Sequence, residues 1–157
     1  MWSVSKRLEY VCASPEHAAW IAPRLRYADS LEIQAYAGIT PIRALSLSLR
    51  ASSMAVTGFW DGEPVGMFGV VPISTVDGIG APWMLGTPKT DKLAREWLVE
   101  APQWLTMLGD GYFVLRNWVD ARNVRSILWL RRMGFKVSGA EPYGVSGLPF
   151  RLFERRV

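Results

Sequence analysis

The segment of residues 112–135 constrains the fold more than any other part of the chain. Its first part, residues 112–119, is rich in aromatic and β-branched residues, which favours a strand. A polar turn leads to Asn123, which is typical of a helix N-cap because its side chain accepts a hydrogen bond from a free backbone N–H. Gly134 suits the left-handed residue after a helix end, and Phe135 can fold back onto the last turn. The segment therefore predicts a strand, a turn and a helix with a defined end.

The size and composition of the chain indicate one folded domain. A length of 157 residues is enough for a single sizeable core. No repeat, low-complexity stretch or linker divides the sequence, so we expect residues 1–157 to form one domain. Half of the residues are hydrophobic, which excludes a disordered chain. No apolar run approaches the roughly 20 residues of a membrane span, and no membrane partner is expected.

Cysteine and histidine are too scarce for a disulfide framework or a metal centre. Cys12 is the only cysteine, and we expect it to be a small core residue. His17 is the only histidine, and its position favours a role at a helix start over one as a base. No metal site is predicted, and the lone cysteine favours a reduced, cytoplasmic setting.

Positive charge is concentrated in one segment. Residues 116–136 contain six basic residues and one acid, Asp120, whereas the whole chain has a net charge of +4. Two interpretations remain open for this segment, a solvated helix face or a landing site for phosphates or an acidic partner. Nucleic-acid binding is not expected, because the sequence places no aromatic platform or groove-reading element beside the charge.

The remaining patterns predict alternating strands and helices. Strands are expected at residues 6–13, 54–60, 65–72, 79–85, 136–140 and 150–154, besides the one at 112–119. A helix is expected to open at Ser14, with helical character resuming over residues 29–37, and further helices are expected at residues 42–49, 90–108 and 123–133. Asp61-Gly62 is a hairpin signal, and Pro102 should kink or split its helix. The order βααβββαβαββ predicts an α/β domain with a mixed, mostly antiparallel sheet flanked by helices.

This order of elements resembles the GNAT (GCN5-related N-acetyltransferase) fold. Asn123, the small residue Ser126 three positions later, and the pair Gly134-Phe135 resemble motif B of that fold. The likeness in topology covers most of the chain, but the motif is specific only over residues 118–135. The resemblance implies a single-domain acyltransferase fold that uses acetyl-coenzyme A.

A narrower resemblance is to a phage-encoded family of GNAT-like proteins, the internal virion protein A of short-tailed phages. It is carried by residues 29–41, by the run at 44–49 and by the block at 118–135. In that family an acid-rich helix ends in an Ala-Gly-Ile-x-Pro turn, and an aromatic strand and an Asn-led helix follow. The resemblance implies a protein of the host cytoplasm, or one associated with the virion, whose partners are phage structural proteins.

The cofactor site that the GNAT resemblance implies is incomplete in this sequence. In the family, a glycine-containing loop after the fourth strand holds the pyrophosphate through backbone N–H groups. The matching residues 86–94 have no glycine after Gly86, Pro88 lacks a donor, and Asp91 adds a negative charge. The residues left for acetyl-coenzyme A by the resemblance are Asn123, Thr87, Lys89, Lys92 and Arg125.

The sequence assigns no catalytic residue. The general acid of the family, a Tyr seven residues after the motif B Asn, is replaced by Leu130, which cannot donate a proton. Tyr143 and Tyr112 remain open as substitutes. The expected strand at 79–85 contains no acid to serve as a base, and the acids in nearby loops are expected to shape turns; they are Asp61, Glu63 and Asp77.

The tryptophans have two possible roles. Helical and strand spacing favours core packing for four of them, Trp97, Trp104, Trp118 and Trp129. Three further tryptophans, at the N-terminus or in expected loops, are candidates for a protein interface; they are Trp2, Trp60 and Trp83.

Two functions remain open from the sequence. The first is a phage-encoded GNAT-fold protein with a degenerate acetyl-coenzyme A site that serves as a virion-associated or assembly component. The second is an active acetyl-coenzyme A-dependent N-acetyltransferase that modifies a host or phage protein. Fold resemblance alone does not separate them, because function depends on the site.

Overall fold

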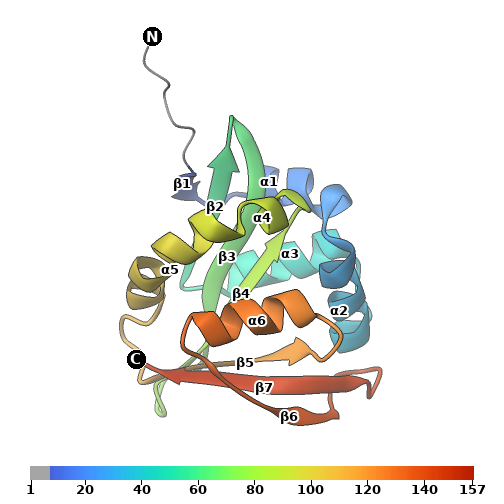
Figure 1. The fold of residues 1–157 in the computed structure, drawn as a ribbon, viewed down its shortest axis with the longest axis vertical. Coiled ribbons are helices and arrows are strands. Elements are labelled where there is room, and N and C mark those ends of the chain that lie inside the picture. The colour runs from blue at the N-terminus through green and yellow to red at the C-terminus, as the bar shows by residue number, and fades with distance from the viewer. Residues whose placement is uncertain (1–7) are drawn as a thin grey trace.

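A computed structural model describes residues 8–157, in which a single seven-stranded sheet has the strand order β1-β2-β3-β4-β5-β7-β6 (Figure 1). The strands are β1 (Glu9–Cys12), β2 (Met54–Trp60), β3 (Glu63–Ser74), β4 (Ile79–Gly86), β5 (Val114–Asp120), β6 (Lys136–Pro142) and β7 (Pro149–Arg156). The helices are α1 (Pro15–Ile21), the short 3-10 helix η1 (Ala22–Arg24), α2 (Tyr27–Ala37), α3 (Pro41–Ala51), α4 (Lys89–Lys92), α5 (Ala94–Leu108) and α6 (Val124–Arg132). Residues 6 and 7 of the predicted first strand, and Trp2, lie outside the described residues.

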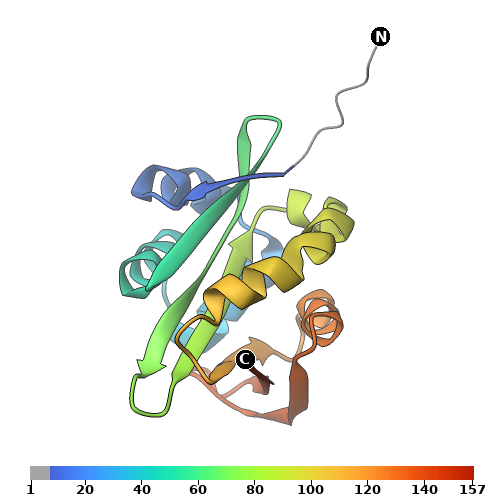
Figure 2. The ribbon, with the colours of Figure 1, turned by 90° about the vertical axis from the view of Figure 1, so that its left-hand side faces the viewer.

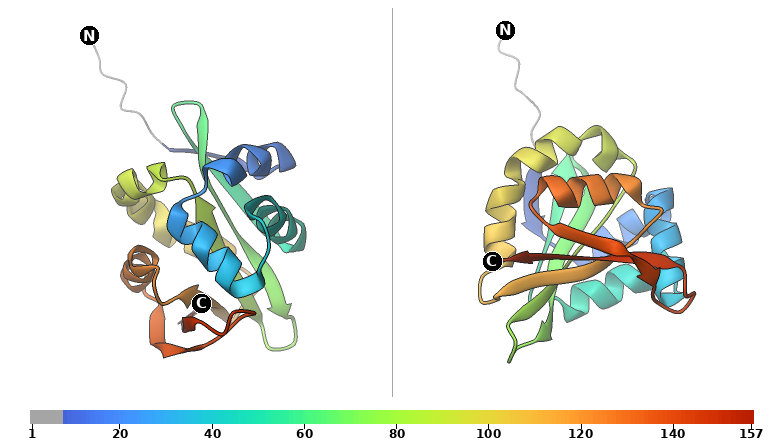
Figure 3. Two further views of the ribbon diagram at one scale, coloured as in Figure 1. Left: turned by 90° about the vertical axis from the view of Figure 1, so that its right-hand side faces the viewer. Right: turned by 60° about the horizontal axis from the view of Figure 1, so that its bottom comes forward.

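The predicted fold class is confirmed. Among the described strands, β4 and β5 form the one parallel pair, and the other neighbours in the sheet are antiparallel. Helices α1, α2 and α3 cover one face of the sheet, and α5 and α6 cover the other (Figures 2 and 3). Each face has its own buried cluster, one packed under α5 and α6 and one under the first three helices.

The residues predicted to begin and end the helix after β5 do so. The Asn123 side chain accepts a hydrogen bond from the Ser126 N–H at 3.4 Å and caps α6. Gly134 has a φ of 89°, and the Phe135 N–H bonds to the Leu130 carbonyl at 3.0 Å. The helix therefore ends in the left-handed arrangement that the Gly-Phe pair predicts.

Helical character resumes in α2 after a break, as expected, because Leu25 and Arg26 have extended backbone angles. The split expected at Pro102 is wrong: α5 runs through Pro102, and the interruption lies at Leu93 instead. The alternative expectation, a kink at Pro102, stays a prediction. The exposed Pro102 ring is tolerated because the opposite face of α5 is held by burial of its apolar side chains, which are Trp97, Ala101, Leu105 and Leu108.

The predictions for single apolar residues have mixed outcomes. Trp97 and Trp104 belong to the core under α5, as expected. Cys12 is exposed, which corrects its assignment to the core, because it lies at the end of the short edge strand β1. Trp60 and Trp83 are both partly buried.

Gly69 lies where the central strands β2 and β3 approach each other closely. A Cβ at this position would lie 2.5 Å from the Met54 carbonyl oxygen and 3.2 Å from the Ala55 Cα, and backbone atoms of a sheet cannot move aside. We expect Gly69→Ala to lower the free energy of unfolding by about 1–3 kcal/mol in urea denaturation. Gly139→Ala is the control, because Gly139 has nothing within 4 Å of the added atom. Equal effects of the two variants would contradict the packing of β2 against β3.

Candidate functional site

The candidate site is the gap that opens between β4 and β5. The strands pair only at Ile79↔Val114 and Gly80↔Leu115, and they then diverge (Figure 1). Just beyond the last pair, the Asn117 Nδ2 donates to the Pro82 carbonyl at 2.9 Å and ties the two strands together. A cavity of about 640 Å³ lies along the gap, with walls from both strands and from α2, α5 and α6. Its volume is in the range of small-molecule sites.

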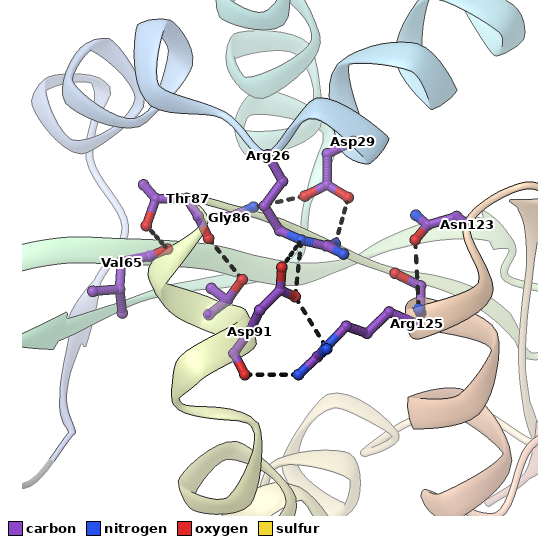
Figure 4. Close-up of polar contacts among 10 residues, drawn as sticks. Arg26, Asp29, Val65, Gly86, Thr87, Asp91, Asn123 and Arg125 are labelled. Carbon is purple, nitrogen blue, oxygen red and sulfur yellow. Dashed lines mark hydrogen bonds and ion pairs between the residues drawn. The ribbon is translucent and has the colours of Figure 1, made fainter.

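The backbone N–H groups of the loop after β4 bond to the protein itself (Figure 4). The Gly86 N–H donates to the Asp29 carboxylate at 3.1 Å, and the Thr87 N–H donates to the Val65 carbonyl at 2.9 Å. The Thr87 hydroxyl also bonds to that carbonyl, at 3.2 Å. These donors therefore point to acceptors of the chain rather than to an open anion site.

The short helix α4 continues this pattern. The Thr90 N–H donates to the Thr87 carbonyl at 3.0 Å, and the Asp91 N–H donates to the Pro88 carbonyl at 3.2 Å. Pro88 itself has no N–H. The Thr90 and Asp91 N–H groups are therefore used within the turn itself and do not converge on an outside anion.

The Asp91 carboxylate lies between two arginines (Figure 4). The Arg26 Nε is 3.2 Å from Asp91 Oδ1, and the Arg125 Nε is 3.3 Å from the same oxygen. Arg125 also donates through Nη2 to the Asp91 carbonyl at 3.0 Å. This ion-pair cluster joins α4 to the N-terminal end of α6, so the negative charge between the two arginines is supplied by the chain itself.

Three of the five residues predicted to hold a cofactor have hydrogen-bond or ion-pair partners within the chain. Arg125 is paired with Asp91, and Thr87 is buried with its hydroxyl on Val65. Asn123 is buried as the α6 cap, and its Nδ2 has no hydrogen-bond partner among the described residues. The two lysines have no ion pair within residues 8–157; they are Lys89 and Lys92. The assignment of all five residues to acetyl-coenzyme A stays a prediction.

A second group of charges lies at the α2 side of the cavity. The Asp120 N–H donates to Glu32 Oε1 at 2.6 Å, and the Asp120 carboxylate pairs with Arg122 at 2.7 Å. Asp29 is buried and pairs with Arg26 at 3.0 Å. Sequence analysis did not assign these α2 residues to the site. The available signal was the spacing of Asp29 and Glu32, which puts two acids on the face of α2 that also carries the buried Ile33.

Burial changes the protonation of these acids. Removal from water raises the pKa of Asp29 to about 6, against the opposing effect of the Arg26 charge. Removal from water also raises the pKa of Glu32 to about 8; the Asp120 N–H opposes this shift, and the charges of Asp29 and Asp120 add to it. Glu32 therefore holds a proton in the folded protein at neutral pH.

No proton donor faces the gap at the position the GNAT resemblance indicates. Leu130 lines the cavity there. Tyr112 is not among the lining residues, and its hydroxyl lies 2.9 Å from the Ser53 Oγ. Tyr143 does line the cavity, but burial raises its pKa to about 12, which makes it a weaker acid. Asp77 bonds to Ser74 within the β3–β4 turn, as expected for a turn residue.

No group of three or more potential metal ligands is found in residues 8–157. No helix in the same part of the chain is long and apolar enough to cross a membrane.

Comparison with solved structures identifies the fold as that of GNAT acetyltransferases. Ard1 from Thermoplasma volcanium matches with a TM-score of 0.71 at 14% identity, over 96% of this chain and 97% of that one. A ribosomal-protein-alanine N-acetyltransferase from Brucella melitensis matches with a TM-score of 0.69 at 15% identity, over 95% and 99%. A GNAT-family acetyltransferase from Streptococcus pneumoniae matches with a TM-score of 0.64 at 14% identity, over 96% and 100%.

Sequence comparisons add nothing to this result. No protein-family model and no curated protein matches the chain. The GNAT fold is therefore established by structure, whereas the resemblance to the phage internal virion proteins stays a prediction.

Replacing Glu32 by Gln should change how stability depends on pH. The folded-state pKa of about 8 lies above the usual value of 4.5, so the folded protein keeps a proton that the unfolded chain releases. The resulting stabilisation is fully present below the unfolded pKa and is lost as the pH rises towards the folded pKa. In thermal melts between about pH 5 and 8, the wild type should therefore lose stability relative to Glu32→Gln.

The control for this measurement is Glu63→Gln, at an exposed position of the β2–β3 hairpin. Its melting temperature should follow that of the wild type across the same pH range. Parallel curves for the wild type and Glu32→Gln would contradict a protonated Glu32 in the folded state.

Proposed function

We propose that the chain is a GNAT-fold protein with a degenerate acetyl-coenzyme A site, and that it acts by binding, as a virion-associated or assembly component of a phage. The observation that carries the proposal is the loop after β4, whose N–H groups bond to Asp29 and Val65. A pyrophosphate is held by backbone N–H groups that are free to donate, and these two are not. The Asp91 carboxylate adds charge repulsion at the same place.

The absence of a proton donor at the position of the general acid that the GNAT resemblance indicates supports the same proposal. Leu130 stands where the fold's general acid is expected, and Tyr143 is a weak acid on the other side of the cavity. The residues present do not fit the cofactor, because they offer neither the glycine-containing loop nor the general acid that the resemblance implies. The cavity itself, with its mostly apolar walls, favours a binding role.

The phage part of the proposal rests on the sequence resemblance. Its two longest stretches, residues 29–41 and 118–135, meet at the cavity, where Glu32 of α2 bonds to Asp120 of β5. The residues that carry the resemblance thus build the candidate site rather than a distant surface. This convergence supports a shared binding role for the site.

An active N-acetyltransferase is the second candidate. The cavity between β4 and β5 favours it, because an acyl-carrying arm would run through a gap of this kind. Activity would require the Arg26–Asp91–Arg125 cluster to open and the loop after β4 to turn its N–H groups outwards.

Coenzyme A binding separates the two candidates. We expect titration calorimetry of the wild type with coenzyme A and acetyl-coenzyme A to detect no binding tighter than about 1 mM, because the Gly86 and Thr87 N–H groups are bonded to Asp29 and Val65 and Asp91 repels phosphate. Micromolar binding would contradict the degenerate site and favour the enzyme.

The Asp91→Asn variant tests the reason for weak binding. Removing this charge leaves Arg26 and Arg125 without their shared carboxylate, so affinity for coenzyme A should rise about tenfold and fall again with added salt. Asp77→Asn, in the exposed β3–β4 turn, should bind as the wild type does. Unchanged affinity of Asp91→Asn would show that Asp91 does not compete with phosphate.

The virion role has its own test. With the chain as bait, a pull-down against portal, capsid and tail proteins of a short-tailed phage should capture one of them. Capture of none of these proteins, together with purified virions that lack the chain, would remove the assembly role.

A further inference from the structure

The outward side of helix α6 is the part of the basic segment that the candidate site leaves unused. The inward side of the helix lines the cavity through Ser126, Trp129 and Leu130. No described element lies over the opposite side (Figures 1 and 3). The exposed residues of that side form the α6 outer face; they are Val124, Arg125, Leu128, Arg131 and Arg132.

Leu128 lies at the centre of the α6 outer face. On a helix, the residues three and four positions away are the neighbours of a side chain. For Leu128 these neighbours are Val124, Arg125, Arg131 and Arg132. Leu128 is 50% exposed and Val124 is 60% exposed. The face therefore combines two aliphatic side chains, one turn apart, with a border of arginines.

The chain itself neutralises only part of the charge of this face. Arg125 pairs with Asp91 at 3.3 Å, whereas Arg131 and Arg132 have no ion pair within residues 8–157. Helix α6 contains no acidic residue, so no carboxylate one turn away compensates these arginines. The helix dipole favours arginines in the last turn, but it gives no reason for the exposed aliphatic residues. The face fits a surface that supplies both acidic and apolar groups.

We propose that the α6 outer face docks an acidic amphipathic helix of a partner protein. Val124 and Leu128 pack against apolar residues one turn apart on that helix, which is the spacing that helical anchors have. Arg131 and Arg132 pair with its carboxylates, since a guanidinium group matches a carboxylate in a two-pronged contact and arginine is enriched at protein interfaces. The inference goes beyond the proposed function, because this face points away from the cavity.

Other occupants fit the α6 outer face less well. A second copy of the chain in a symmetric contact would set arginines against arginines. Single-stranded nucleic acid binds by stacking its bases on aromatic rings, and none of the five residues of the face is aromatic. A helix that lies on a membrane needs a wide apolar side, whereas only two of these five residues are apolar. Charge and shape together favour an acidic polypeptide.

Nuclear magnetic resonance titration of the full chain, without coenzyme A, tests the inference. The probe is an alanine-rich helical peptide with a pair of leucines one turn apart and glutamates on both sides of the pair. The matched probe has glutamine in place of each glutamate. We expect the acidic peptide to shift the Leu128 and Arg132 amide signals in a saturable way, with a Kd of about 0.1–1 mM that rises with added salt. The glutamine peptide should bind at least about tenfold more weakly.

Two variants assign the effect to this face. The double variant Arg131→Gln/Arg132→Gln should weaken the acidic peptide at least about tenfold, and Leu128→Gln should weaken it about fivefold. The control is the double variant Arg43→Gln/Arg50→Gln, which removes the same charge at exposed positions of α3, on the opposite face of the sheet (Figure 2). It should bind the peptide as the wild type does.

Equal binding of the two peptides, or an unchanged affinity of Arg131→Gln/Arg132→Gln, would overturn the inference. Tighter saturable binding of a single-stranded oligonucleotide, or of vesicles that contain phosphatidylglycerol, at the same amides would also overturn it, because the partner would then be nucleic acid or a membrane. None of these outcomes depends on whether coenzyme A binds in the cavity.

Discussion

The rest of the site depends on the contacts that the buried Asp29 carboxylate makes with Gly86 and Arg26. It joins the first turn of α2 to the end of β4 by accepting from the Gly86 N–H, and it pairs with Arg26. Because β4 and β5 have separated by this point, the sheet no longer satisfies that N–H. A side chain from another element takes over, as buried backbone groups require. The position of α2, and with it the cavity wall, follows from this bond.

The chain keeps the gap of the GNAT fold, but the Gly86–Asp29 bond uses one of the N–H groups beside it. A GNAT fold leaves a gap between its parallel strands, and this chain keeps the gap with a cavity of about 640 Å³. Its acids and arginines, however, are arranged to satisfy one another across the loop after β4. The Glu32 carboxyl group, on the α2 side, has no arginine partner within residues 8–157.

Short-range signals account for what the sequence predicted well. The cap at Asn123, the end of α6 at Gly134 and the hairpin at Asp61-Gly62 each depend on neighbouring residues, and all three are found. The contacts that define the site span long distances in sequence. Arg26 and Asp91 are 65 residues apart, and Glu32 and Asp120 are 88 apart, so neither local pattern nor composition indicates them. The split expected at Pro102 is absent for a related reason, since tertiary burial outweighs a local helix-breaking preference.

Hydrogen exchange at the Gly86 and Thr87 amides tests the central claim most directly. If both amides are bonded to Asp29 and Val65, they should exchange slowly, and an excess of coenzyme A should leave their rates and chemical shifts unchanged. Rapid exchange without ligand, or protection that appears only when coenzyme A is added, would show that the loop is free to hold a pyrophosphate. That result would contradict the degenerate site.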